Sequence, residues 1–234
     1  MTDITGRQGF LLHLDSSADD AADSVTRRLT ARFAAVWRAH HEQAGYRYRD
    51  LAADPVPLPA AAYATLGRRV ERQGVVPLAA VARLARGAAE EREWALTRPL
   101  IEELRGAHTV LLGVPMYNFT VPAALKSWID RVTFPGAFTA PESGASLLAG
   151  TRVVVVVARG GGYGPGTPRE AYDFQVPYLR AYFGNLGVAE DRLRFIKAEL
   201  TRAGDIPALT RFQDLAKESL AAAQAEVSAL AAGR

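Results

Sequence analysis

The stretch that decides the fold is TRVVVVVA, residues 151–158. Its five consecutive valines form a β-branched run with no polar side chain to turn toward water. A run this apolar is typical of a central parallel strand that is covered on both faces. We therefore expect an α/β protein in which the glycine-rich stretch 159–166 is the loop that leaves this strand.

Strands and helices alternate on either side of this run. Short apolar or alternating segments predict four more strands, at 9–14, 46–51, 108–114 and 192–198. Helical spacing and composition predict helices at 24–41, 77–106, 121–132, 171–185 and 206–232. Pro99 should mark a kink or the start of a second helix, and Thr120 is the expected N-cap of the helix at 121–132. The alternation predicts a doubly wound parallel sheet of five strands in the order 2-1-3-4-5, with the alternating second strand at an edge.

Length and composition restrict the kind of protein. The 234 residues, 49% of them hydrophobic, predict one domain spanning 1–234. The chain has no cysteine, so redox chemistry would need a borrowed cofactor. A net charge of +3, with arginines scattered along predicted helices, argues against a nucleic-acid partner. Because no segment approaches the roughly 18 apolar residues of a membrane span, we expect a cytoplasmic protein with no membrane partner.

Ligands of such sheets bind beyond the carboxyl ends of the strands, where three loops are predicted: 15–24, 115–120 and 158–166. The first loop contains the hydroxyls of Ser16, Ser17, Ser24 and Thr26, the last two at a helix start, which suits a phosphate monoester. Ser24 is equally explained as an N-cap alone. The aspartates of this segment would repel a phosphate unless they point away; they are Asp15, Asp19, Asp20 and Asp23.

The other two loops suit a flat heterocycle. MYNF at 116–119 combines apolar and aromatic surface with one amide that can donate and accept hydrogen bonds, although a packed turn would explain it as well. Gly160 and Gly161 would let backbone approach a ligand closely, or would simply form a flexible turn. The glycines fit neither a Rossmann fingerprint nor a Walker loop. The four histidines lack metal-ligand spacing, so no metal site is predicted.

Short motifs along most of the chain resemble the FMN-dependent NAD(P)H azoreductase and quinone reductase family. They are RDLA at 49–52, PMYNF at 115–119, Leu125, Lys126 and Asp130, ARGG at 158–161, and PYL at 177–179. The resemblance implies a flavodoxin-like homodimer with one FMN per subunit, each site completed by the partner chain. It also implies NADH or NADPH as co-substrate.

The resemblance also implies roles for individual residues. The expected cofactor-binding residues are Ser16, Ser24, Thr26, Met116, Tyr117, Asn118, Phe119, Arg159, Gly160 and Gly161. The hydroxyl residues would hold the phosphate, residues 116–119 would line the isoalloxazine ring, and the two glycines would approach its pyrimidine and N5 side. The family usually has Ser-Gln-Ser where this chain has Ser24-Val25-Thr26, and Ser-Arg-Gly-Gly where it has ARGG. Asn118 and Tyr163 are the nominated catalytic residues.

The function implied is reduction of quinones or aromatic azo compounds by ping-pong hydride transfer. The loop 133–146 departs from the family pattern, and its Phe134 and Phe138 are expected to border the flavin together with Phe119 and Tyr163. A small flat aromatic or quinonoid molecule is therefore the expected substrate. Two alternatives stay open. One is a pathway-specific flavoprotein for a single aromatic or quinonoid intermediate, and the other is a non-catalytic flavin-binding electron carrier.

Overall fold

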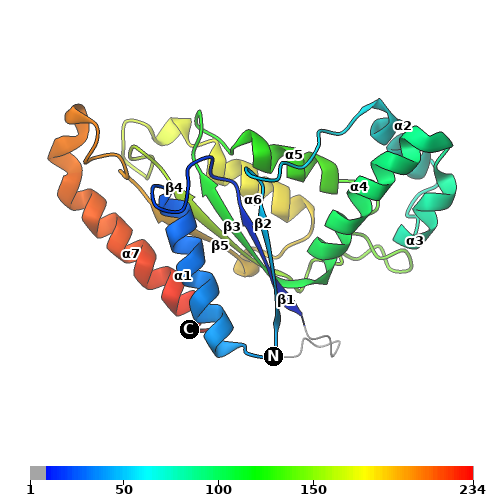
Figure 1. Ribbon diagram of the computed structural model, residues 1–234, viewed down its shortest axis with the longest axis horizontal. Coiled ribbons are helices and arrows are strands. Elements are labelled where there is room, and N and C mark those ends of the chain that lie inside the picture. Colours follow the sequence, from blue (N-terminus) through cyan, green and yellow to red (C-terminus); the bar gives the residue numbers. More distant parts are fainter. Residues whose placement is uncertain (1–8, 234) are drawn as a thin grey trace.

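The computed structural model describes residues 9–233 and has at its centre a five-stranded, fully parallel sheet (Figure 1). The strands are β1 (Phe10–Asp15), β2 (Gly45–Asp50), β3 (Ala107–Pro115), β4 (Arg152–Ala158) and β5 (Leu193–Ala198). Their order is β2-β1-β3-β4-β5, which confirms the predicted order and places the alternating β2 at an edge. The chain leaves β1 toward β2 on one side and returns to β3 on the other, so the carboxyl ends of β1 and β3 are the switch point of the sheet.

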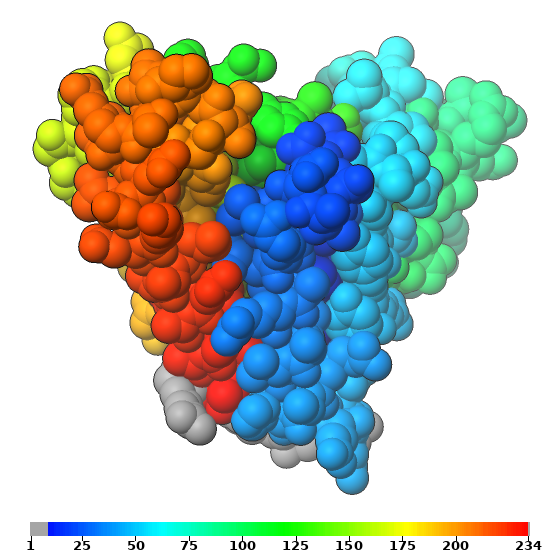
Figure 2. All heavy atoms as spheres, turned by 60° about the vertical axis from the view of Figure 1, so that its left-hand side comes forward, coloured from blue at the N-terminus to red at the C-terminus, as the bar shows by residue number. Residues whose placement is uncertain are grey.

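Strand β4 is buried on both faces, as its valine run predicts. Val154 and Val156 pack with helices α1 (Val25–His40) and α7 (Gln213–Ala231). These two helices lie side by side over one face of the sheet (Figure 2), where Arg32 of α1 donates a 2.7 Å hydrogen bond to Ser228 of α7. Val153, Val155 and Val157 belong to the apolar cluster on the other face.

The opposite face is covered by the remaining helices. They are α2 (Ala61–Glu71), α3 (Leu78–Val81), α4 (Gly87–Gly106), α5 (Ala123–Val132) and α6 (Gln175–Asn185). Short 3₁₀ segments complete the chain at Ala82–Leu84, Glu170–Tyr172, Glu190–Arg192 and Pro207–Phe212. Helices α2 and α3 extend the layer away from α1 and α7, on the right in Figure 1. In the part of the chain that the structure describes, no helix has the length and apolar character needed to span a bilayer.

Some local details differ from the predictions. Helix α2 was not among the predicted helices. Helix α4 runs through Pro99, so a second helix does not start there. Helix α5 begins at Ala123 with Pro122 as its N-cap, because Thr120 instead forms a two-residue turn with Tyr117, each backbone amide donating to the other's carbonyl at 3.1 Å.

The divergent loop 133–146 places its two phenylalanines in the core. Phe134 is 4% exposed and its ring centroid lies 5.1 Å from that of Trp94 and 5.4 Å from that of Tyr63. Phe138 is 6% exposed in the same apolar cluster. The expectation that these two phenylalanines border the flavin is therefore wrong for this chain, because both are buried in the core, Phe134 against Tyr63 of α2 and Trp94 of α4.

Candidate functional site

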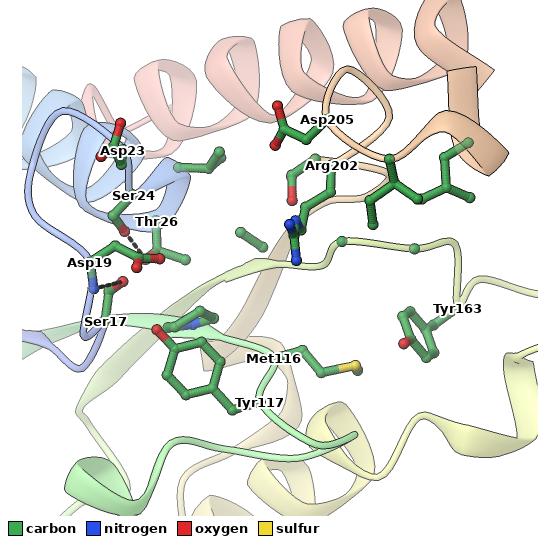
Figure 3. A pocket seen from close by; sticks show the side chains of 18 of the residues that line it. Ser17, Asp19, Asp23, Ser24, Thr26, Met116, Tyr117, Tyr163, Arg202 and Asp205 are labelled. Atoms are coloured by element: carbon green, nitrogen blue, oxygen red, sulfur yellow. Dashed lines mark hydrogen bonds between the residues drawn. The ribbon is translucent and has the colours of Figure 1, made fainter. Parts of the chain in front are cut away.

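Four loops enclose a cavity of about 810 Å³ at the carboxyl ends of the strands (Figure 3). This volume is in the range of small-molecule and cofactor sites. Three of the loops are those predicted from the sequence, and the fourth follows β5. The predicted site residues that line the cavity are Ser24, Thr26, Met116, Tyr117, Gly160, Gly161 and Tyr163. Those that do not are Ser16, Asn118, Phe119 and Arg159.

Hydroxyl groups line one end of the cavity. Ser17, Ser24 and Thr26 are each at most 4% exposed, and the hydroxyls of Ser24 and Thr26 are 3.0 Å apart. Ser24 is also the N-cap of α1, since its side chain accepts from the amide of Arg27 at 3.3 Å. The first amides of a helix have no helical carbonyl to bond, and the positive end of the helix dipole lies here. This end of the cavity can therefore bind an anion.

Ser16 is not part of this hydroxyl cluster, contrary to the prediction. Its hydroxyl donates to the carbonyl of Gly113 at 2.8 Å, and its amide donates to the same oxygen at 3.1 Å. The side chain is only 2% exposed and joins the end of β1 to β3. The neighbouring Ser17 lines the cavity instead. The sequence analysis named it among the loop hydroxyls but not among the expected cofactor ligands.

The four aspartates of the first loop have different surroundings. Asp15 is buried beneath the loop, where it accepts from Thr30 and Tyr48 at 2.9 and 3.2 Å. Asp20 accepts from two loop amides at 2.8 and 3.1 Å. Asp19 and Asp23 line the cavity. Asp15 and Asp20 therefore point away from the cavity, as an anion site requires, whereas Asp19 and Asp23 leave negative charge at its edge.

Arg27 fixes the shape of the first loop. Its guanidinium donates all five of its hydrogen bonds, at 2.7 to 3.1 Å. Two go to the carbonyls of Ser17 and Asp19, two to the carboxylate of Asp50 at the end of β2, and one to Tyr48. Because these carbonyls point toward Arg27, their negative dipole ends are held away from an anion in the cavity.

The groups that bond to Arg27 keep their protonation states near neutral pH. The hydrogen bond from Arg27, ahead of every other influence, lowers the pKa of Asp50. Burial, followed by the charge of Asp15, raises the pKa of Tyr48 to about 12, so its hydroxyl stays protonated and can donate to Asp15. The contribution of the Asp50 carboxylate to stability is fully present above its unfolded-state pKa and is lost only as pH falls through the lowered folded-state value.

The second loop is a tight turn whose two central residues have positive φ. Asn118 has φ +48° and Phe119 has φ +71°, and both side chains are exposed. Asparagine is one of the residues that tolerate this region, whereas a phenylalanine there is strained. Met116 and Tyr117 precede the turn and line the cavity, and the hydroxyl of Tyr117 accepts from the amide of Ala18 at 3.1 Å. Within this chain, Asn118 therefore shapes the turn and does not line the cavity.

We expect Phe119→Gly to be more stable than Phe119→Ala by about 1 kcal/mol. Both changes remove the ring, whose centroid lies 5.5 Å from that of Tyr172, but only glycine relieves the left-handed backbone strain. Urea unfolding of the two variants measures the difference. Equal stabilities would show that the backbone at this position carries no strain.

The third loop combines close backbone approach with a buried charge network. Gly160 and Gly161 line the cavity, and the Tyr163 side chain stands at its far end from the hydroxyls (Figure 3). Arg159 is fully buried and does not reach the cavity: its guanidinium donates to Asp173 at 2.9 Å and to Glu199 at 3.0 Å. Both carboxylates hold the side chain beneath the loop, and its predicted role as a cofactor-binding residue stays a prediction.

Glu199 connects Arg159 to the backbone of the glycine loop. Its carboxylate accepts from the amides of Tyr163 and Gly164 at 3.2 and 3.3 Å. The following amides, of Leu200 and Thr201, donate to the carbonyls of Gly161 and Arg159 at 3.1 and 3.0 Å. The fourth loop is thus attached to the third by side chain and backbone.

The fourth loop is the part of the site that the sequence analysis missed. Residues of this loop that line the cavity are Thr201, Arg202, Asp205, Ile206, Ala208 and Leu209. The loop has no motif of its own, and its position after the last parallel strand is the only sequence signal that could have indicated it. Among residues 9–233, no cluster of His, Asp or Glu is arranged to hold a metal ion.

A family model described as "Flavodoxin-like fold" matches residues 11–225. The chain belongs to this flavodoxin-like family. An FMN-dependent NADH:quinone oxidoreductase of Nocardia farcinica is 44% identical over 199 residues, which cover 85% of this chain and 87% of the relative. The protein of the same description from Streptomyces avermitilis is 39% identical over 222 residues, covering 94% of each chain. The membership predicted from the motifs is thereby confirmed.

Solved structures confirm the predicted fold. An azoreductase from Bacillus anthracis superposes with a TM-score of 0.77 at 20% identity, covering 97% of this chain and all of the other. An FMN-dependent NADH-azoreductase from the same species, solved in complex with FMN, gives a TM-score of 0.73 at 19% identity, covering 95% and 97% of the two chains. At this level of sequence identity the structural similarity shows only that the fold is flavodoxin-like.

Proposed function

We propose that this protein is an FMN-dependent NAD(P)H oxidoreductase that reduces quinones and aromatic azo compounds. The observation that carries the proposal is the cavity at the switch point of the sheet, with hydroxyls and a helix start at one end and glycine backbone at the other. The relatives that share 39% and 44% identity are named FMN-dependent NADH:quinone oxidoreductases, which supports the quinone part of the proposal.

The chemistry of the cavity fits FMN. Ser17, Ser24 and Thr26 would hold the terminal phosphate together with the first amides of α1. Met116 and Tyr117 offer one apolar wall to the ring, and Gly160 and Gly161 allow backbone to approach it. The cavity offers one phosphate cradle, which favours FMN over a dinucleotide flavin.

FMN, when bound, supplies the group that takes a hydride from the nicotinamide and passes it to the acceptor. The chain itself orients the ring, excludes water and donates hydrogen bonds. Tyr163, which is 8% exposed and lines the cavity, is the residue proposed to act beside the reacting molecules. Asn118 contributes only by forming the turn that follows Met116 and Tyr117. Donor and acceptor would occupy the same space in turn, because hydride transfer requires a stacked approach to about 3 to 3.5 Å.

The decisive experiment is a titration of the purified apoprotein with FMN and FAD, followed by anaerobic addition of NADH or NADPH. We expect tighter binding of FMN, bleaching of its absorption by the nicotinamide, and reoxidation by a simple benzoquinone, with parallel double-reciprocal lines in steady state. Absence of FMN binding would refute the cofactor. Bleaching without reoxidation by any quinone or azo dye would favour an enzyme dedicated to one intermediate, and no bleaching at all would favour an electron carrier.

We expect the protein to form a homodimer whose second subunit covers an exposed aromatic cluster beside the cavity. The cluster consists of Phe119, Tyr172 and Phe174, which are 43%, 51% and 58% exposed. Phe119 and Tyr172 are in ring contact, and the amide of Phe174 donates to the carbonyl of Phe119 at 3.2 Å. Light scattering at micromolar and nanomolar concentrations measures the assembly; a fully active monomer would contradict it.

Two further expectations accompany the proposal. The family match over residues 11–225 supports a single domain. The cytoplasmic location stays a prediction that cell fractionation would check.

A further inference from the structure

The hydroxyl end of the cavity carries a charge imbalance. Asp19 and Asp23 line it, and Asp205 of the fourth loop adds a third carboxylate to the lining. A phosphate monoester brings a charge of about −1.5 to −2 at neutral pH, whereas a helix start offers only about half a positive charge. Three carboxylates in the lining oppose the binding of a phosphate at the hydroxyl end, and a cationic side chain in the cavity would offset this repulsion.

The arginines closest in sequence to the hydroxyls are already engaged. Arg27 has donated all five of its hydrogen bonds to protein acceptors. Arg28 donates to the carbonyl of Ala22. Neither side chain lines the cavity.

Two other arginines do line the cavity, Arg169 and Arg202. Within residues 9–233, neither side chain makes a hydrogen bond or ion pair. They stand over different parts of the glycine loop: a Cβ on Gly160 would lie 3.2 Å from Cδ of Arg202, and one on Gly161 would lie 3.3 Å from Nη1 of Arg169. The Arg202 side chain points into the space between the hydroxyl end and Met116 (Figure 3).

The backbone holds Arg202 in this position. The preceding amides of Leu200 and Thr201 are bonded to the glycine loop, and the carbonyl of Arg202 accepts from Asp205 and Ile206 at 3.1 and 3.0 Å. Leu200 has φ +58°, a left-handed conformation that is unfavourable for leucine. Such strain persists only where surrounding contacts enforce it, and here it directs the chain back over the cavity.

We propose that Arg202 is the cationic ligand of the cofactor's phosphate, supplied from the loop after β5 across the cavity from the hydroxyls of α1. The inference rests on the proposed FMN site and adds to it a charged group outside the three motif-bearing loops. Gly160 has a second role in this arrangement, because its missing side chain leaves room for the aliphatic stem of Arg202.

The test compares FMN with riboflavin, which lacks the phosphate, on Arg202→Gln, Arg202→Lys and the matched control Arg169→Gln. Fluorescence titration at low ionic strength should show FMN affinity falling at least about tenfold in Arg202→Gln, with riboflavin affinity changed less than about twofold. Arg202→Lys should retain most of the FMN affinity, and Arg169→Gln should keep the native ratio of FMN to riboflavin affinity. Salt should weaken FMN binding more steeply in the native protein than in Arg202→Gln.

An unchanged FMN to riboflavin ratio in both Arg202 variants would overturn the inference, even if their activity fell. An equal loss of affinity for FMN and riboflavin would also overturn the inference, because it would show that Arg202 acts on the ring and not on the phosphate. If the native protein bound neither flavin, the proposed function itself would fail, which is a different result from any outcome of the Arg202 comparison.

Discussion

Ser24→Asp is expected to fold as stably as the native chain and yet lose FMN affinity by at least about 100-fold. Aspartate is as good an N-cap as serine and favours the positive end of the helix dipole, so α1 keeps its start. The new carboxylate would stand where the phosphate is proposed to bind. Two like charges about 4 Å apart repel by about 4 kcal/mol near a protein surface, which is enough for this loss after partial screening.

The measurement is parallel titration with FMN and riboflavin, together with thermal unfolding of the apoprotein. Ser24→Asn is the matched control, because it preserves the cap without adding a charge. We expect the affinity of Ser24→Asn for FMN to lie within about tenfold of that of the native chain. Equal FMN affinity in Ser24→Asp and the native protein would place the phosphate elsewhere.

Arg159→Ala is expected to lower the free energy of unfolding of the apoprotein by about 3 kcal/mol or more. The change removes a fully buried cation and leaves the carboxylates of Asp173 and Glu199, only 15% and 19% exposed, without their partner. Glu199 would then present unbalanced charge beneath the glycine loop whose amides it accepts from.

Urea unfolding without FMN separates this structural effect from ligand binding. Arg98→Ala serves as the control, since Arg98 pairs with Glu102 at 2.7 Å with both side chains about half exposed; its loss should cost less than about 1 kcal/mol. A native-like stability in Arg159→Ala, combined with weaker FMN binding, would restore Arg159 as a direct ligand of the cofactor.

The parts of the fold that follow local rules were predictable from the sequence. The valines of β4 alone indicate a strand buried on both faces, and the alternation of strands and helices led to the observed strand order. Three of the four loops around the cavity followed, because parallel strands end at one edge of the sheet.

The remaining features depend on contacts between distant residues. Arg159 is followed by glycines that suggest a ligand, but its partners lie 14 and 40 positions further along the chain. Helix α2 contains Gly67, a poor helix former, at which an added Cβ would lie 3.6 Å from Cδ of Pro135 in the divergent loop. Tertiary packing, and not local helix propensity, determines whether such a segment is helical. The burial of Phe134 against it could therefore not be predicted from the sequence alone.

The hydrogen bonds from Arg27 to Ser17, Asp19 and Asp50 have a consequence for the kinetics of cofactor binding. A loop that orders only around its ligand slows association and weakens affinity, because the conformational entropy is lost at the moment of binding. Here that entropy is already lost when the chain folds, since five hydrogen bonds within the protein hold the loop. Arrival of the phosphate is then governed by diffusion and charge, and substitutions around the cavity act chiefly on the residence time of the cofactor.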